Sequence, residues 1–385
     1  MSDRSFEVVH NIPSPYRLHL FRTLGEELAV RGYRFRVHFM AAGHADRQHW
    51  KLSAPDLGFE HRFWPDLPLR VRGKAWHLNP TLLAHLVGSA PDVLMVGGPW
   101  DSLTAMLGSA VRRARLRVAW FEGNTSTPGR VAGLPVLFKR ALLAGYHRFA
   151  VPGREGVAFA RLIAGPAAER RSLVLPNIVD EKRFREERPQ EAAAVRAELG
   201  VRAGERLAIW PARLIRAKGV PEFLSNLHPT YLEGWRLAII GEGPLERTAR
   251  QICSERGLSE RVVFKPSIPY ERMPAAYQAA DLFVLPSLND QNPLSVVEAM
   301  HSGLPILVST RIGNHPEALG DGANGWSFDP ADGAAARAAA AAAFGSPEAE
   351  LRQRGEVSRR KAFEHWNSRS TVTRFLSGLL GERDE

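Results

Sequence analysis

The sequence contains a single cysteine, Cys253, and no long uncharged hydrophobic run. One cysteine excludes a disulfide framework and a cysteine-rich zinc ribbon. No apolar run approaches the ~18 residues of a membrane-spanning helix. The first residues, MSDRSFEVVHN, lack the apolar stretch of a signal peptide. These absences favour a protein of the reducing cytoplasm.

Acidic residues are fewer than basic residues, 41 against 51, so the formal net charge is +10. Such a balance is typical of proteins that bind nucleic acid or an anionic membrane. The whole excess lies in residues 1–180, which contain 24 basic and 14 acidic residues, whereas residues 181–385 contain 27 of each. Arginine outnumbers lysine 44 to 7, so a coding bias is the alternative explanation of the charge.

Short apolar segments alternate with stretches of helix length along all 385 residues. This alternation is typical of βαβ units in a parallel sheet. The expected strands of the first series are Ser5–His10, Phe35–Met40, Val93–Val96, Arg117–Phe121, Arg148–Val151 and Ser172–Leu175. Those of the second series are Arg206–Trp210, Arg236–Ile240, Val262–Phe264, Leu282–Leu285 and Pro305–Ser309.

The two series predict an α/β protein of two doubly wound, Rossmann-like domains, residues 1–185 and 186–359. The break falls in residues 181–198, which are highly charged and carry no strand pattern. A final helix at about 360–385 is expected to pack back on the first domain. Ligands of open parallel sheets bind outside the carboxyl ends of the strands, so we expect the site in a cleft between the domains.

The segment after the expected strand 282–285 favours phosphate binding. Asn292 is a good N-cap and Pro293 a good first helical residue. The backbone N–H groups of Leu294 and Ser295 would then lie unpaired in the first turn, where a helix attracts anions.

Two carboxylates belong to the same segment. Glu298 lies further along the expected helix, where it can accept hydrogen bonds from two vicinal hydroxyls, and Asp290 lies on the loop before it. The alternative is that Asp290 and Asn292 only cap the helix.

Two further loops follow strands of the second series. Arg213 and Lys218 are two cations that can hold a diphosphate without a metal, or form an ordinary solvated loop. Gly241 and Gly243 allow a close backbone approach to a ligand, although the third glycine of a dinucleotide-binding motif is missing.

In this order, the segments resemble the C-terminal domain of family 4 glycosyltransferases, which are retaining enzymes of the GT-B fold. The matching residues are Pro176-Asn177 with Asp180, Arg213 with Lys218-Gly219, Gly241 with Gly243-Pro244, Val262 with Phe264, Ala280-Asp281 with Pro286-Ser287, Asp290 with Glu298-Ala299-Met300, Gly303 with Pro305, and Asn324-Gly325. In the first half, Pro13-Ser14-Pro15-Tyr16-Arg17 resembles a subgroup with a P-x-P-Y-R motif.

The resemblance implies that a hexose-type sugar moves from a nucleoside-diphosphate sugar, with UDP or GDP undetermined, to an acceptor hydroxyl. It implies retention of configuration and no metal or other cofactor; no D-x-D motif stands at a strand end. The residues it implies for catalysis are Asp290, Glu122, Arg213 and Lys218. Those for donor binding are Arg213, Lys218, Gly241, Gly243, Ser267, Ile268, Asp290, Gln291, Asn292, Leu294, Ser295 and Glu298. Those on the acceptor side are Pro15, Tyr16, Arg17, Gly98, Trp100 and Glu122.

Two positions depart from the family pattern. The family usually has Glu where this chain has Asp290, and the shorter side chain changes the sugar or its pose. Many members have His where this chain has Glu122. Glu122 then faces the sugar or acceptor, or it is a buried carboxylate paired with a nearby arginine.

The acceptor is expected on the basic first half, as a glycan, a lipid-linked intermediate or a small natural product in a bacterial biosynthetic route. Residues 101–150 carry eight basic and two acidic side chains, so peripheral contact with an anionic inner membrane surface is one interpretation and a solvated face the other. An epimerase-like GT-B enzyme is disfavoured by the cations and carboxylates of the second half. A nucleic-acid-binding protein is disfavoured because aromatics are not interleaved with the cations.

Overall fold

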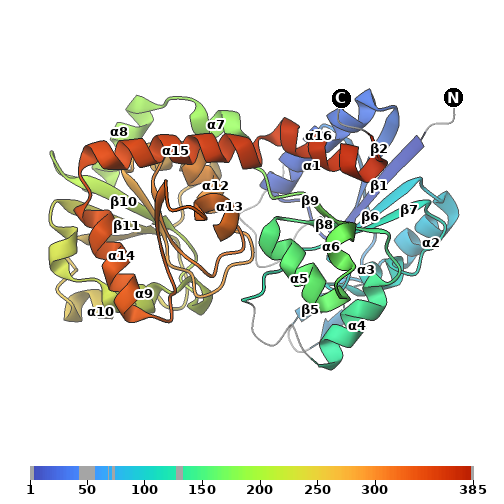
Figure 1. The fold of residues 1–385 in the computed structure, drawn as a ribbon, viewed down its shortest axis with the longest axis horizontal. Helices are drawn as coiled ribbons and strands as arrows, with labels where there is room; N and C mark the ends of the chain where they lie inside the picture. The colour runs from blue at the N-terminus through green and yellow to red at the C-terminus, as the bar shows by residue number, and fades with distance from the viewer. Residues whose placement is uncertain (1–3, 43–56, 68, 72–73, 127–132, 383–385) are drawn as a thin grey trace. The chain divides into compact units, whose positions relative to one another are not determined.

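The computed structural model describes residues 4–42, 57–67, 69–71, 74–126 and 133–382. The chain divides into two compact units (Figure 1). Unit 1 comprises Met1–Ile178 and Ser368–Glu385, and unit 2 comprises Val179–Asn367. None of the helices in these ranges is long and apolar enough to cross a bilayer.

Unit 1 is built on a seven-stranded parallel sheet of order β3-β2-β1-β6-β7-β8-β9. The strands are β1 (Arg4–His10), β2 (Tyr33–Phe39), β3 (Glu60–Phe63), β6 (Val93–Gly97), β7 (Leu116–Trp120), β8 (Arg148–Val151) and β9 (Ser172–Val174). A short antiparallel pair, β4 (Leu69–Val71) and β5 (Lys74–Trp76), stands apart from this sheet. The helices are α1 (Pro15–Val30), α2 (Pro80–Ser89), α3 (Leu103–Gly108), α4 (Leu134–Leu143), α5 (Arg154–Ala164), α6 (Ala168–Arg171) and α16 (Ser368–Leu380).

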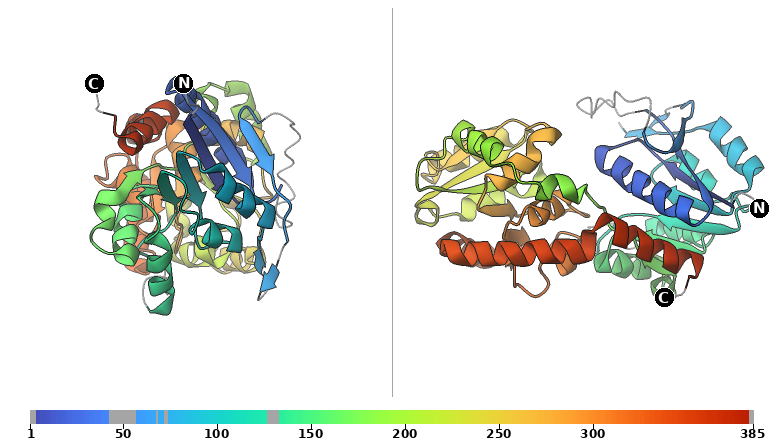
Figure 2. Two further views of the ribbon diagram at one scale, coloured as in Figure 1. Left: turned by 90° about the vertical axis from the view of Figure 1, so that its right-hand side faces the viewer. Right: turned by 90° about the horizontal axis from the view of Figure 1, so that it is seen from above.

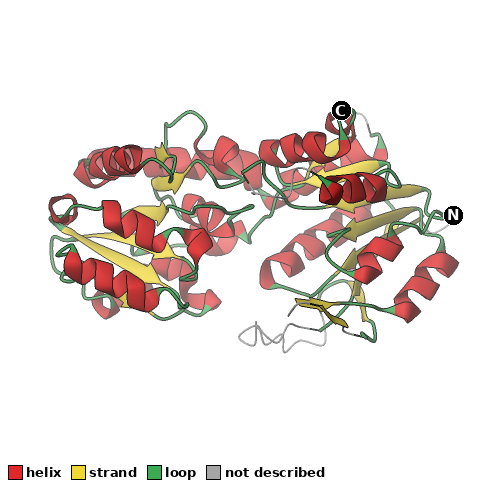
Figure 3. Ribbon diagram, turned by 90° about the horizontal axis from the view of Figure 1, so that it is seen from below, coloured by secondary structure: helices red, strands yellow, loops and turns green. Residues whose placement is uncertain are grey.

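The sheet of unit 1 has an apolar core on each face, as a parallel sheet covered by helices on both sides requires. Val8 of β1 lies in the core shared with α1 and α16, whereas the next residue, Val9, lies in the core shared with α2 and α5. This alternation follows from the two-residue period of a strand. Figures 2 and 3 show helices on both sides of the sheets.

Unit 2 is built on a six-stranded parallel sheet of order β12-β11-β10-β13-β14-β15. The strands are β10 (Arg206–Pro211), β11 (Trp235–Ile240), β12 (Val262–Lys265), β13 (Leu282–Leu285), β14 (Ile306–Ser309) and β15 (Gly325–Phe328). The α-helices are α7 (Glu181–Arg185), α8 (Pro189–Glu198), α9 (Val220–Asn226), α10 (Glu246–Glu255), α11 (Met273–Gln278), α12 (Leu294–His301), α13 (His315–Leu319), α14 (Gly333–Gly345) and α15 (Glu348–Trp366). Three 3₁₀ turns complete the unit: η2 (Arg216–Lys218), η3 (Pro229–Leu232) and η4 (Tyr270–Arg272).

The predicted fold class, two doubly wound Rossmann-like domains with parallel sheets, is confirmed. Every predicted strand forms, with its ends shifted by at most two residues. The strands that the sequence did not predict are short or weakly apolar. Strand β3 has an exposed burial pattern, and β15 reads Gly-Trp-Ser-Phe without an apolar run.

The chain crosses between the units after Ile178 and again before Ser368, whereas the sequence placed the boundaries near 185 and 360. Helix α7 lies in unit 2 because Phe184 is fully buried in the core of that unit. The expected final helix is the end of α15 followed by α16. Helix α16 packs on α1 and β9 (Figure 1), where Arg369 Nε and the Thr373 hydroxyl donate to Glu27 at 2.9 and 3.0 Å.

Candidate functional site

The strand order of each sheet reverses at one place, which in doubly wound folds marks the ligand-binding end. In unit 2 the reversal lies between β10 and β13, and in unit 1 it lies between β1 and β6. Lys218 and Asp290 follow β10 and β13, while Arg17 and Gly98 follow β1 and β6. The sequence-predicted residues therefore lie at the carboxyl edge of their own sheet.

Lys218 and Asp290 form an ion pair at the reversal point of unit 2. Their side chains are 19% and 17% exposed, so the pair is partly buried yet still reachable. The backbone of Asp290 is fixed as well. Its N–H donates to the backbone carbonyl of Arg311 at 3.3 Å, and its own carbonyl accepts from the N–H of Gly313 at 2.9 Å. The pair places a cation at the end of η2 beside a carboxylate on the loop after β13.

Arg213 lies on the loop after β10 and its side chain is exposed. Within the described ranges, no carboxylate pairs with it. A guanidinium without a protein partner remains available to a phosphate, which it can bind with two parallel hydrogen bonds.

Gly241 and Gly243 follow β11, and their closest neighbour is the adjacent loop of the same unit. A Cβ on Gly241, whose φ is +141°, would lie 2.2 Å from the carbonyl oxygen of Ala212. A Cβ on Gly243 would lie 2.5 Å from that of Leu214. These glycines thus allow the loops after β10 and β11 to pack together, which positions Arg213 independently of any contact with a ligand.

Helix α12 begins at Leu294, with Pro293 at the N-cap position and no side-chain capping bond there. The prediction that Asn292 is the N-cap was therefore wrong by one residue. The buried Asn314 explains the shift, because its Nδ2 donates to the carbonyl of Pro293 at 3.0 Å and holds that residue in an extended conformation. The N–H groups of Leu294 and Ser295 remain in the first turn, where an anion can bind.

Glu298 lies in α12 and accepts a hydrogen bond from the Tyr277 hydroxyl, 2.7 Å from its Oε2. Burial raises the pKa of Glu298 to about 7, and the Tyr277 bond and the charge of Arg183 only partly oppose this effect. Arg183 also stacks on Tyr270, 4.8 Å from the ring centroid. The sequence did not indicate these three neighbours, which come from α7, η4 and α11.

The remaining donor-side candidates lie on two loops. Ser267 is exposed and Ile268 half-buried after β12, and Gln291 and Asn292 are half-buried before α12. Strands β12, β11, β10 and β13 are consecutive neighbours in the sheet, so their loops line one continuous edge.

On the acceptor side, Glu122 forms an ion pair with Arg17 and accepts a second bond from Asn177 Nδ2 at 3.1 Å. Both bonds use Oε1, and the Glu122 side chain keeps 24% exposure. The expected pairing with an arginine thus forms, although Glu122 is half-buried rather than buried and can still face a ligand. Arg17 lies over Trp120, and its Nε and Nη1 are buried without an acceptor.

The other acceptor-side candidates lie at the start of α1 and on the loop after β6. Tyr16 stacks on Arg17, 5.2 Å from its guanidinium carbon, and Pro15 begins α1. Gly98 adopts a φ of +58°. Trp100 packs against Phe121, with 5.1 Å between the ring centroids. The basic stretch 101–150 lies partly outside the described residues, which omit 127–132.

His10 is half-buried beside Trp120, with 5.4 Å between the ring centroids, and its Nδ1 lies 3.1 Å from the carbonyl of Ile12. Burial, together with the charge of Arg17, lowers the pKa of His10 to about 3. The imidazole therefore stays neutral at physiological pH and acts as packing.

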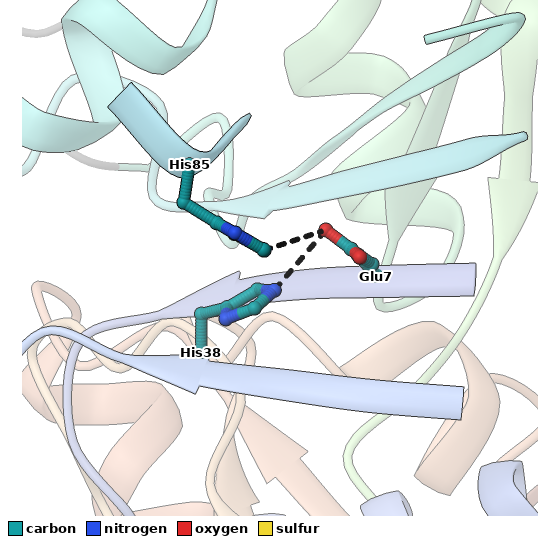
Figure 4. A group of neighbouring side chains, drawn as sticks. All are labelled: Glu7, His38 and His85. Carbon is teal, nitrogen blue, oxygen red and sulfur yellow. Dashed lines mark hydrogen bonds and ion pairs between the residues drawn. The ribbon is translucent and has the colours of Figure 1, made fainter. Parts of the chain in front are cut away.

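Glu7, His38 and His85 form a cluster that the sequence could not indicate, because they belong to β1, β2 and α2 (Figure 4). His38 Nε2 lies 3.1 Å and His85 Nε2 3.9 Å from Glu7 Oε2. Trp64 Nε1, which can only donate, lies 3.1 Å from His38 Nδ1. His38 Nδ1 is therefore an acceptor and its Nε2 carries the proton.

This tautomer does not suit a metal ligand. A metal on His38 Nε2 would move the proton to Nδ1, against the Trp64 N–H, whereas metal-bound histidines donate from their other nitrogen. The cluster is better described as a hydrogen-bonded chain from Trp64 through His38 to the buried carboxylate of Glu7, with His85 beside it.

Residues 192–359 match the sequence model of the family described as Glycosyl transferases group 1. The "GDP-mannose-dependent alpha-(1-6)-phosphatidylinositol monomannoside mannosyltransferase" of Mycolicibacterium smegmatis is 31% identical over 225 residues, covering 54% of this chain and 56% of the relative. The "D-inositol 3-phosphate glycosyltransferase" of Nocardia farcinica is 34% identical over 188 residues, covering 43% and 40%. The chain thus spans about half the length, or less, of these curated relatives.

Solved structures with the same fold align with nearly the whole chain. Anabaena Alr3699/HepE in complex with UDP and glucose has a TM-score of 0.73 at 16% identity, with 99% of this chain and 100% of that chain covered. WaaG, a glycosyltransferase involved in lipopolysaccharide biosynthesis, has a TM-score of 0.67 at 16% identity, covering 98% and 100%. Residues 192–359 thus match the group 1 glycosyltransferase family, and the predicted GT-B class of fold is confirmed.

Proposed function

We propose that this chain transfers a hexose-type sugar from a nucleoside-diphosphate sugar to an acceptor hydroxyl, with retention of configuration and without a metal ion. The observation that carries the proposal is the Lys218–Asp290 pair at the reversal point of the unit 2 sheet. It lies within the matched glycosyltransferase domain. A nucleoside-diphosphate sugar needs a cation for its diphosphate and a polar acceptor for its sugar hydroxyls. Lys218 and Asp290 supply these two groups side by side.

Breaking the bond between the anomeric carbon and the diphosphate builds positive charge on the sugar and negative charge on the leaving group. Lys218, Arg213 and the first N–H groups of α12 stabilise the leaving diphosphate. These groups supply the positive charge that a metal would otherwise bring. Asp290, with the backbone of Gln291 and Asn292, holds the hexose.

Glu298 holds the ribose hydroxyls of the donor. Tyr277 occupies one of its oxygens, which leaves Oε1 as the acceptor for a vicinal diol. Ser267 and Ile268 contact the nucleobase through their backbone groups. On the other unit, Glu122 faces the acceptor, and the buried Arg17 holds its carboxylate in place.

Donor binding is expected to survive removal of divalent metal. A UDP-sugar or a GDP-sugar should raise the melting temperature in EDTA as much as in MgCl₂, because ligand binding to the folded state stabilises it. A differential scanning fluorimetry screen of UDP-, GDP- and dTDP-sugars measures this, with the free sugars as controls. A shift that appears only with Mg²⁺ would overturn the metal-free site, and no shift with any nucleotide sugar would overturn the reaction.

We propose further that the acceptor is a lipid-linked or glycan intermediate reached at an anionic membrane surface. Helix α4 supports this proposal, because Leu134, Leu137 and Phe138 are 81%, 58% and 48% exposed. Its other side is held in the unit 1 core by Val136 and Leu143. Exposed apolar side chains on a helix of a basic unit are typical of interfacial docking.

The double variant Leu134→Ser/Phe138→Ser is expected to lose most binding to phosphatidylglycerol vesicles in a sedimentation assay, while its donor-induced thermal shift stays that of the wild type. The matched control is Val87→Ser, since Val87 is 51% exposed on another helix of unit 1. Equal vesicle binding by wild type and double variant, or no binding by either, would favour a soluble acceptor.

A further inference from the structure

Basic side chains gather at the amino edge of the unit 1 sheet, opposite the edge that carries the acceptor-side residues. Arg117 is the second residue of β7 and Arg148 the first residue of β8, directly after His147. The two strands are paired, with Val118 opposite Arg148. Arg171 ends α6 just before β9. We call Arg112, Arg117, His147, Arg148 and Arg171 the amino-edge cluster.

The hydrogen bonds of the cluster bring two donors face to face. The backbone N–H of Arg117 donates to His147 Nδ1 at 3.0 Å, so this nitrogen carries a lone pair and the proton of the neutral ring is on Nε2. Arg117 Nη2 lies 3.5 Å from His147 Nε2, and a guanidinium nitrogen can only donate. Neither group is an acceptor for the other.

Two of the three guanidinium nitrogens of Arg117 lack a hydrogen-bond acceptor among the described residues. Its Nε and Nη1 are buried and have no hydrogen-bond partner. Buried N–H groups are rarely left unsatisfied, because each costs the free energy of its lost hydration. The side chain therefore lacks an acceptor that would compensate its burial.

The charges of the cluster are also uncompensated. Among the residues that the structure describes, no carboxylate pairs with Arg112, Arg117, Arg148 or Arg171. Arg171 donates to the carbonyls of Leu143 and Tyr146, and Arg148 to that of His147.

The positive charges of the cluster instead repel one another. Burial, and then the charge of Arg112, lowers the pKa of Arg117. Burial followed by Arg117, Arg171 and Arg148 lowers the pKa of His147. An anion bound here would relieve this repulsion.

We propose that the amino-edge cluster binds a phosphate-type oxyanion. One oxygen accepts from both His147 Nε2 and Arg117 Nη2, since two donors 3.5 Å apart can both reach one acceptor at ordinary hydrogen-bond distance. A second oxygen accepts from Arg148, and the remaining arginines balance the charge. Phosphate fits because it offers several oxygens and more than one negative charge to guanidinium groups.

The site belongs to unit 1 alone and uses none of the residues assigned to donor or acceptor. The same chemistry is offered by a soluble phosphate compound and by the headgroup of an anionic phospholipid. Two arms of the experiment separate these sources: isothermal titration with inorganic phosphate or pyrophosphate, and sedimentation with vesicles that contain phosphatidic acid.

Arg148→Gln is expected to weaken binding in the responding arm about tenfold, which corresponds to the loss of one charge-assisted hydrogen bond. The matched control is Arg161→Gln, which removes the same charge from an exposed arginine of unit 1 that pairs with Glu169. Binding in either arm that depends on Arg148 and not on Arg161 supports the site. No binding in both arms, or equal weakening by the two variants, overturns it.

Arg117→Met tests the buried guanidinium separately. In phosphate-free buffer this variant should melt at a higher temperature than the wild type, because an uncompensated buried charge is removed while the side-chain volume is kept. The variant should also lose the thermal shift that phosphate produces. A lower melting temperature with a retained phosphate response would contradict the proposal, and unchanged donor binding by both variants keeps this result distinct from failure of the transferase function.

Discussion

The variant Glu298→Gln should bind a nucleotide sugar at least tenfold more weakly than the wild type at pH 8, and yet be the more stable protein. In the proposed function the carboxylate accepts hydrogen bonds from the ribose hydroxyls, and losing a bond to a charged acceptor costs about 1.5–3 kcal/mol. Glutamine keeps the shape and the Tyr277 contact but has no charge to bury.

The gain in stability follows from the raised pKa of Glu298, about 7 in the folded chain against 4.5 as the ordinary value. Because the folded state holds this proton more tightly, the contribution of Glu298 to stability is fully present below pH 4.5. It falls as the pH rises to about 7 and then stays constant. The wild type should lose stability over that range relative to Glu298→Gln.

Chemical denaturation at a series of pH values measures the stability difference, and isothermal titration measures donor affinity. In the wild type, affinity should rise from pH 6 to pH 8 as the carboxylate forms. Glu246→Gln serves as the control, since Glu246 lies on α10 and pairs with the exposed Arg250. Wild-type affinity in Glu298→Gln would refute the assignment of Glu298 to the donor.

Lys218→Met should reduce turnover by about 10²–10³-fold, the usual effect of removing one preorganised group that stabilises transition-state charge. The variant should also be less stable, because Asp290 is left partly buried without its cation. The double variant Lys218→Met/Asp290→Asn removes both charges and should recover stability while remaining inactive.

Steady-state kinetics together with thermal melting distinguish these outcomes. Arg216→Gln is the matched control, because Arg216 is an exposed cation in the same 3₁₀ turn. Recovery of turnover in the double variant would mean that Lys218 acts only by neutralising Asp290. Wild-type turnover in the single variant would remove Lys218 from the site.

The part of this architecture that could be predicted from sequence is the part that local patterns determine. Short apolar runs predicted the strands, since a strand covered on both faces must be apolar along its length. The position of Lys218 and Asp290 after strands predicted that they would share one edge of the sheet. Their direct ion pair could not be read from the sequence, because it depends on a contact between residues 72 positions apart.

The unpredicted features come from tertiary contacts. The start of α12 moves from Asn292 because Asn314, more than 20 residues away, binds the carbonyl before it. Gly241 was interpreted through ligand approach, whereas a neighbouring loop fills the space beside it. Tyr277 gave no signal of its own, since a tyrosine in an apolar helix is equally suited to a core.

The double crossing of the chain between its units makes unit 2 an insertion in unit 1. A fragment that ends at Ile178 lacks Val372, Phe375, Leu376 and Leu379, which complete one core of unit 1. Residues 179–367 are by contrast continuous and contain the whole matched domain. Recombination between relatives can therefore exchange unit 2 as one continuous segment with two joins, whereas unit 1 can be exchanged only together with residues 368–385.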